Sequence, residues 1–72
     1  MRQNVGMDIE LNGQPKCIDA CASIFALLER EGMAERRVAV EVNGEIIPRS
    51  LHATHALVEG DRVEIVHALG GG

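Results

Sequence analysis

Apolar and acidic residues alternate near the start of the chain, as they do in a half-buried β-strand. The alternation runs over residues 7–11 and is followed by Asn12-Gly13. An Asn-Gly pair tolerates positive φ at both central positions of a two-residue hairpin turn, so the pattern predicts a strand, a tight turn and a returning strand over residues 14–18. Pro15 cannot donate a hydrogen bond to a neighbouring strand, and the returning strand is therefore expected at an edge of the sheet.

A helical period comes next along the chain. One face collects four apolar residues and one acid, which are Ala20, Ile24, Leu27, Leu28 and Glu31. Asp19 or Ser23 can cap the start of this helix, and Gly32 suits the left-handed backbone position at its end. Phe25 lies beside the apolar face, where we expect it at the edge of the core, and an exposed contact for a partner is the alternative.

Alternation returns in the second half of the chain. Residues 38–42 predict a strand, Asn43-Gly44 repeats the hairpin signal, and residues 45–47 predict a short returning strand that ends at Pro48. The first five predicted elements are thus two hairpins with a helix between them.

The last part of the chain predicts a loop and a final strand. Residues 50–57 have no clean period and are expected to form a loop with one helical turn, and a turn at residues 59–61 leads into a strand over residues 62–69. That strand directs two apolar residues to the core and two charged ones to solvent: Val63 and Ile65, then Arg62 and Glu64. The order of elements predicts an α+β fold, a mixed sheet of four to five strands with one main helix packed on one face.

Length and charge narrow the class of function. The 72 residues allow one domain with a small core, and the net charge is -4 with no basic run beyond Arg36-Arg37. Nucleic-acid binding relies on a basic patch, so the balance favours basic protein surfaces as partners instead. No stretch reaches the ~20 apolar residues of a membrane span, and the start lacks the apolar core of a signal peptide. We therefore expect a cytoplasmic protein in which residues 1–6 are a disordered extension and Met1 or Met7 is the natural start.

Few residues in the folded part of the chain are candidates for catalysis, metal binding or redox chemistry. The chain has no glycine-rich phosphate loop and no Cys-x-x-Cys pair, and we expect no metal. Cys17 and Cys21 would flank each other on one helix, and our interpretation is two small, partly buried thiols without a metal or redox role. His52 and His55 would form a chelate only if their loop were helical, and we expect both at the surface.

Other polar residues are candidates for contacts rather than catalysis. Glu29, Glu31 and Glu35 are expected to form a solvated acidic face, with docking as the alternative. His67, near the end of the last strand, needs no function, although it could contact a partner.

The chain ends in Leu69 followed by Gly70, Gly71 and Gly72. Glycine has no Cβ and allows close backbone approach, and four extended residues reach about 13 Å. The only chemical group at the tip is the carboxylate of Gly72, which is a poor electrophile until it is activated. Any chemistry there must be performed by a partner enzyme. Taken alone, terminal glycines are also typical of a frayed end.

Two segments carry a family resemblance. VAVEVNGEIIPRS and VEGDRVEIVHALGGG resemble the ThiS family, the sulfur-carrier proteins of thiamine biosynthesis. The shared marks are an early strand-turn-strand, the pair Leu27-Leu28 on a helix, the Asn-x-x-x-Ile-Pro-Arg stretch over residues 43–49, and a Gly-Asp turn before a strand that ends in Gly-Gly. The likeness covers residues 7–72. It implies a ubiquitin-like β-grasp domain over residues 7–69 with a flexible glycine tail, residues 70–72.

The resemblance also implies a mechanism in which the chain is a substrate and not an enzyme. An E1-like, ThiF-like adenylating enzyme would use ATP to convert the Gly72 carboxylate into an acyl-adenylate. Sulfur from a cysteine desulfurase pathway would then give a thiocarboxylate, which would donate its sulfur to a ThiG-like thiazole synthase. Gly70, Gly71 and Gly72 would thread the partner's active site. No stably bound cofactor is implied, and Cys17 and Cys21 match no sulfur site of the family.

Affinity for these partners is expected to come from the folded body. Ordering each tail residue costs about 1–2 kcal/mol, and glycines offer almost no apolar area to offset it. We expect docking through the exposed sheet face and the Pro48-Arg49 region, with four candidate residues: Arg49, Glu64, His67 and Leu69. Four other functions stay open, namely a carrier like the small subunit of molybdopterin synthase, a related carrier for another sulfur-containing metabolite, a ubiquitin-like modifier joined to lysines through Gly72, and an interaction domain with an inert tail.

Overall fold

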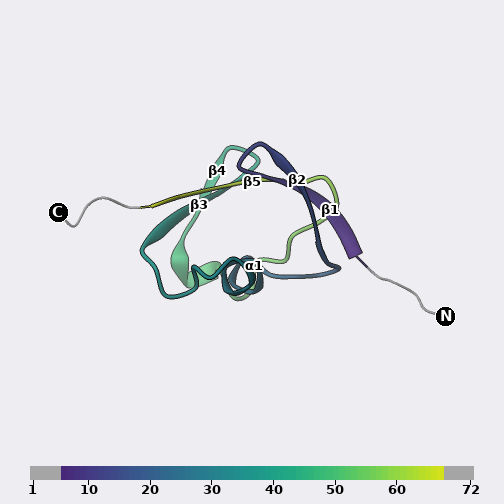
Figure 1. Cartoon of the computed structure of the whole chain (residues 1–72). Coiled ribbons are helices and arrows are strands. Elements are labelled where there is room, and N and C mark those ends of the chain that lie inside the picture. Colours follow the sequence, from purple (N-terminus) through teal and green to yellow (C-terminus); the bar gives the residue numbers. More distant parts are fainter. Residues whose placement is uncertain (1–5, 68–72) are drawn as a thin grey trace.

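The computed structural model describes residues 6–67, which form a sheet with one main helix beneath it (Figure 1). The strands are β1 (Gly6–Leu11), β2 (Gln14–Asp19), β3 (Val38–Val42), β4 (Glu45–Ile47) and β5 (Arg62–His67). The helix is α1 (Ile24–Arg30), and a single 3₁₀ turn, η1 (Arg49–Leu51), follows β4. The predicted α+β class, with the helix on one face of the sheet, is confirmed.

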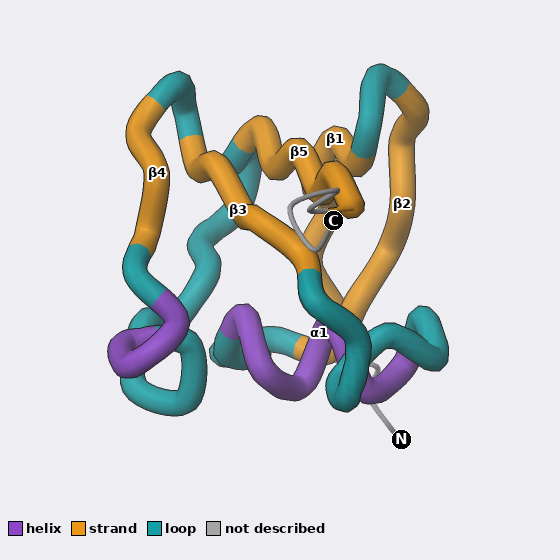
Figure 2. The backbone as a smooth tube through the Cα atoms, turned by 90° about the vertical axis from the view of Figure 1, so that its left-hand side faces the viewer, coloured by secondary structure: helices purple, strands orange, loops and turns teal. Residues whose placement is uncertain are grey.

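The last strand of the chain lies in the middle of the sheet. The strand order is β2-β1-β5-β3-β4, and Figure 2 shows the two hairpins on either side of β5. β1 and β5 run parallel, whereas β3 pairs antiparallel with both β5 and β4. Pro15 lies on β2, which is an edge strand as predicted. β5 is therefore hydrogen-bonded along both of its edges.

Both hairpins turn at an Asn-Gly pair with positive φ. Asn12 and Gly13 have φ values of 50° and 84°, and Asn43 and Gly44 have 53° and 87°. This is the backbone that a two-residue hairpin with matching strand twist requires, and Asn and Gly adopt it with the least strain. The two turn predictions are confirmed.

The core lies between the sheet and α1. Twelve apolar residues are buried: Met7, Ile9, Ile18, Ile24, Leu27, Leu28, Val40, Val42, Ile47, Leu57, Val63 and Ile65. Every strand contributes to this core, and β1, β3 and β5 do so at alternate positions, so one face of the sheet is apolar and the other faces solvent. Val63 and Ile65 are buried while Arg62 and Glu64 are exposed, as predicted.

Contacts with the segment after η1 hold the start of α1. The amides of the first two helical residues donate to the carbonyl oxygens of His55 (3.1 Å) and His52 (2.9 Å). The amide of Ala26 donates to Ser23 Oγ at 3.0 Å, so Ser23 is the N-cap, while Asp19 ends β2. A seven-residue helix is too short to be stable alone. Its stability therefore depends on these partners and on its buried face.

The end of α1 confirms the expectation for Gly32. Gly32 has φ 76°, and its amide donates to the carbonyl of Glu29 at 3.0 Å. The next amide, of Met33, donates to the carbonyl of Leu28 at 2.7 Å. This pair of bonds is the Schellman motif, which satisfies carbonyls that a helix end would otherwise leave without a partner.

The sequence placed two element boundaries incorrectly. Ala20 does not belong to the helix, because β2 continues to Asp19 and a turn separates it from α1. β1 begins at Gly6, within the predicted extension; a Cβ there would lie 3.0 Å from Cys17 Sγ, so only glycine fits beside β2 without adjustment. The remainder of that extension, residues 1–5, lies outside the described residues.

Replacing Ser23 with alanine tests the helix cap. The change removes the acceptor for the Ala26 amide, and we expect the free energy of unfolding to fall by about 1 kcal/mol. Urea titration followed by circular dichroism measures it. Ser50→Ala, in the exposed turn η1, is the control and should change stability by less than about 0.5 kcal/mol. Equal stability of the two variants would contradict this account of the cap.

Candidate functional site

The site predicted from the sequence is reached through β5. His67, the last residue of β5, pairs in register with Val38, the first residue of β3. Five residues follow His67 in the sequence and end at Gly72. The predicted sulfur-bearing residue and the tail, including the docking candidate Leu69, lie outside the described residues. The structure therefore describes the strand that leads to the site and the surfaces beside that strand.

A buried carboxylate fixes the start of β5. Asp61 is 7% exposed, and its two carboxylate oxygens accept hydrogen bonds from Asn43 Nδ2 (3.0 Å) and the amide of Val58 (2.9 Å). Asn43 Oδ1 in turn accepts from the amide of Arg62 at 2.9 Å. A buried carboxylate is tolerated when its oxygens are hydrogen-bonded, as they are here. These bonds join the turn between β3 and β4 to the residue at which β5 begins.

The asparagine of the other hairpin does the same further along β5. Asn12 Oδ1 accepts from the backbone amide of Ile65 at 2.8 Å, and the backbone amide of Asn12 donates to the carbonyl of Val63 at 2.9 Å. Sequence reasoning treated Asn12 and Asn43 only as turn residues and missed these bonds. The available signal was the choice of Asn, and not Gly or Asp, at the same position of both turns, since an amide can both donate and accept.

The sheet face that points away from α1 combines carboxylates with bare apolar side chains. Glu41 on β3 lies directly opposite Glu64 on β5, and like charges in this position destabilise a sheet. Ile46, which pairs with Glu41 from β4, is 62% exposed, and Val66 is 56% exposed. We call these four residues, Glu41, Ile46, Glu64 and Val66, the acidic face.

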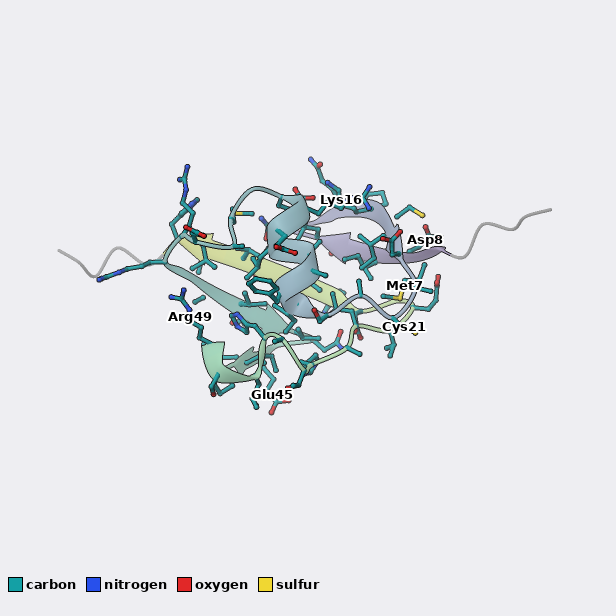
Figure 3. All side chains as sticks on the ribbon, turned by 90° about the horizontal axis from the view of Figure 1, so that it is seen from below. Met7, Asp8, Lys16, Cys21, Glu45 and Arg49 are labelled. Carbon is teal, nitrogen blue, oxygen red and sulfur yellow. The ribbon has the colours of Figure 1, made fainter. Side chains whose placement is uncertain are left out.

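A small pocket lies on the opposite side of the sheet, against α1. It has a volume of about 100 Å³, and its walls include four apolar residues and two arginines: Phe25, Leu28, Ala34, Val38, Arg36 and Arg49. Figure 3 shows Arg49 from the helix side. Arg49 and Glu64, both docking candidates from the sequence, thus lie on opposite faces of the sheet. His67 is exposed beside Val38, on the side of the pocket.

The surface prediction for His52 is wrong. His52 is 5% exposed, and its Nε2 lies 3.0 Å from the carbonyl oxygen of Ile47, within hydrogen-bonding distance. Its loop folds back under the sheet after η1, so the ring becomes part of the layer that contacts α1. With Nε2 engaged in this way, a chelate with His55 is not formed. Within residues 6–67, no three His, Cys, Asp or Glu side chains are grouped so as to hold a metal ion.

The cysteines also differ from their prediction. Both are free and exposed, and they do not share a helix: Cys17 is on β2 and Cys21 is in the turn that follows, with φ 66°. Cys17 precedes the buried Ile18, so alternation along the strand turns its thiol away from the core. The two thiols are therefore accessible to solvent reagents.

The acidic surface predicted on the helix, formed by Glu29, Glu31 and Glu35, is only partly exposed to solvent. Glu29 and Glu35 are exposed, whereas Glu31 is half-buried and its carboxylate lies 2.8 Å from Lys16 Nζ on β2. Phe25 is 41% exposed and belongs to the pocket wall, so it is both at the edge of the core and accessible to a partner. Across residues 6–67, no helix has the length and apolar character needed to cross a membrane.

Comparisons with known proteins point to one family. A family model described as "ThiS family" matches residues 9–72. A thiazole synthase from Paramagnetospirillum magneticum is 42% identical over 66 residues, which are 92% of this chain and 20% of that protein. The chain thus spans about a fifth of the length of the curated relatives it matches first. The sulfur carrier protein ThiS of Escherichia coli K12 is 29% identical over 66 residues, covering 92% of this chain and 100% of that protein.

A solved structure agrees with these sequence matches. The crystal structure of the thiamine biosynthesis protein ThiS from Geobacter metallireducens superposes with a TM-score of 0.80 at 32% identity, covering 92% of this chain and 100% of that one. This likeness confirms the predicted β-grasp fold.

Replacing Asn43 with glycine tests the link between the hairpin turn and β5. Glycine keeps the positive φ but removes the bonds to Asp61 and Arg62, so we expect a loss of about 1–3 kcal/mol in the free energy of unfolding. Asn12→Gly, which loses a single side-chain bond to β5, is the matched comparison and should lose less. Urea titration measures both. Parent-like stability of Asn43→Gly would refute the role given to this side chain.

Proposed function

Because the chain belongs to the ThiS family, we propose that it is the sulfur carrier of thiazole formation in thiamine biosynthesis, with the Gly72 carboxylate as the group that carries sulfur. The observation that carries the proposal is the family match, which extends to the terminal glycine. A relative that this chain covers over its full length is named a sulfur carrier protein, which supports the same function.

The chemistry requires activation of a carboxylate by another protein. In an E1-like, ThiF-like adenylating enzyme, a Gly72 carboxylate oxygen attacks the α-phosphate of ATP, and pyrophosphate leaves. The outer sulfur of a persulfide, supplied by a cysteine desulfurase, then displaces AMP. A second thiol cleaves the resulting acyl disulfide and leaves a thiocarboxylate on Gly72. These steps need ATP and reduced thiols, so we place the carrier in the cytoplasm. The chain supplies a substrate group and does no catalysis.

The acceptor we propose is a thiazole synthase. In the relatives that bear this name, a segment similar to almost the whole of our chain is part of a protein about five times longer. Two activities that share one chain in some proteins commonly act on each other as separate chains in others. We therefore infer that this carrier delivers its sulfur to a thiazole synthase, with residues 70–72 threading the acceptor's site.

We propose that the acidic face docks on a basic surface of the adenylating enzyme. Glu41 and Glu64 lie opposite each other and repel, at a cost of about 0.2–1 kcal/mol to the sheet. A partner that presents Lys or Arg relieves this repulsion and covers the bare side chains of Ile46 and Val66. Binding energy from the folded body then offsets the ordering of the glycine tail.

Intact-mass spectrometry tests the proposed function. After incubation with adenylating enzyme, ATP and a persulfide donor, the parent chain should gain the mass difference between sulfur and oxygen. A chain that lacks Gly71 and Gly72 should gain nothing, because its new terminal carboxylate, on Gly70, is two residues too short to reach the adenylating site. The double variant Cys17→Ala, Cys21→Ala is the control and should gain mass like the parent. A gain by the truncated chain, or none by the double variant, would contradict the proposal.

Replacing Glu64 with glutamine tests the acidic face. The variant loses the repulsion with Glu41, so its free energy of unfolding should rise while its affinity for the adenylating enzyme falls several-fold. Calorimetric titration and urea unfolding measure the two effects. Glu35→Gln has the same charge change away from this face and should bind like the parent. Equal binding by both variants would remove the acidic face from the docking surface.

A further inference from the structure

The pocket against α1 has a charge opposite to that of the rest of the molecule. Arg36 and Arg49 line it, and neither has a carboxylate within ion-pair distance among residues 6–67, where the single ion pair joins Lys16 and Glu31. The whole chain has a net charge of -4, and carboxylates dominate the other sheet face. Two exposed guanidinium groups without acidic partners favour a ligand that brings carboxylates.

The acids of the adjoining groove do not pair with the arginines of this pocket. Glu29 and Glu35 border an adjoining groove that shares Arg36, but neither comes within ion-pair distance of it. Arg49 lines the pocket and is absent from that groove. The charge of the pocket is therefore available to a partner.

The pocket walls suit one apolar side chain. Phe25, Leu28 and Val38 supply apolar surface, and Phe25 is 41% exposed. The volume of about 100 Å³ is somewhat smaller than a cavity of about 150 Å³ that holds benzene, so it fits one branched aliphatic group. An exposed aromatic residue beside arginines is also the composition at which binding energy concentrates in protein interfaces.

The pocket adjoins the end of the strand that leads to the tail. Val38, in the pocket wall, pairs with His67, after which only five residues remain before the end of the chain. A protein whose active site takes Gly72 must therefore come close to this end of the sheet. The same approach brings its surface to the pocket.

We propose that this pocket receives an acidic segment of the thiazole synthase. One aliphatic side chain of that segment enters between Phe25 and Val38, and neighbouring carboxylates pair with Arg36 and Arg49. The proposal rests on the proposed function and adds the chemistry of the partner surface. It assigns the two charged surfaces to different partners, because a basic surface that complements the acidic face would repel the arginines here.

Charge reversal tests the proposal directly. Purified thiazole synthase from the source organism is titrated with the full-length parent chain and with Arg36→Glu and Arg49→Glu. We expect each variant to bind about tenfold more weakly, because it both loses an ion pair and repels the partner's carboxylates. Arg30→Glu has the same charge change on α1 outside the pocket, and it should bind within about threefold of the parent. Equal weakening by Arg30→Glu would overturn the proposal.

A steric change separates the pocket from general electrostatics. Ala53 lines the pocket and is exposed, so Ala53→Leu should fill the pocket without unfolding the chain or altering its charge. It should weaken binding of thiazole synthase about tenfold, whereas Ala56→Leu, at an exposed position outside the pocket, should not. Circular dichroism confirms folding of each variant. Parent-like binding by Ala53→Leu would overturn the proposal.

Different measurements identify other occupants of the pocket and test the proposed function. If Arg49→Glu abolishes a dimer of the parent chain seen by analytical ultracentrifugation, the occupant is a second copy and the proposal is wrong. If removal of residues 68–72 strengthens binding of a synthetic Asp-Leu-Glu peptide at Phe25, seen by NMR, the tail is the occupant and the proposal is also wrong. Failure of the parent to form a thiocarboxylate refutes the proposed function. If the parent forms a thiocarboxylate but the pocket variants bind thiazole synthase as tightly as the parent, only the proposal about the pocket is refuted.

Discussion

The hydrogen bonds that hold β5 between two hairpins support every other feature of this protein. β5 pairs with β1 and β3, and Asn12 and Asn43 extend those pairings with their side chains. Because β5 also contributes Val63 and Ile65 to the core, it cannot shift along the sheet without exposing apolar area and breaking bonds on both sides. The chain therefore continues toward Gly72 from a strand that is held on both sides.

This arrangement divides the work between a folded body and a terminal carboxylate. The body provides surfaces of opposite charge on its two sides, an acidic one around Glu64 and a basic one around Arg49. In the proposed function two successive partners act on the same terminus, and surfaces of opposite charge would allow each to recognise the carrier without competing for identical contacts. Under this proposal, two charged surfaces are enough for a chain of this size to be a substrate of more than one enzyme.

Local rules predicted most of the fold, and features that depend on tertiary packing escaped them. The Asn-Gly turns, the edge position of Pro15 and the helix end at Gly32 follow from backbone preferences that act over a few residues. The burial of His52 could not be predicted, because it depends on how the segment after η1 packs against α1. Nor could strand alternation reveal that Arg49, beyond the end of β4, lies on the other side of the sheet from Glu64.

The central claim is that the terminal carboxylate, and no side chain, carries the sulfur. Cys17 and Cys21 are both exposed thiols, so they are the real competitors for this role. Loading the chain with isotopically labelled persulfide, followed by tandem mass spectrometry of its proteolytic fragments, locates the label. The account predicts all of the label on the fragment that ends at Gly72, as a thiocarboxylate. Label held as a persulfide on the fragment with Cys17 or Cys21 would contradict it.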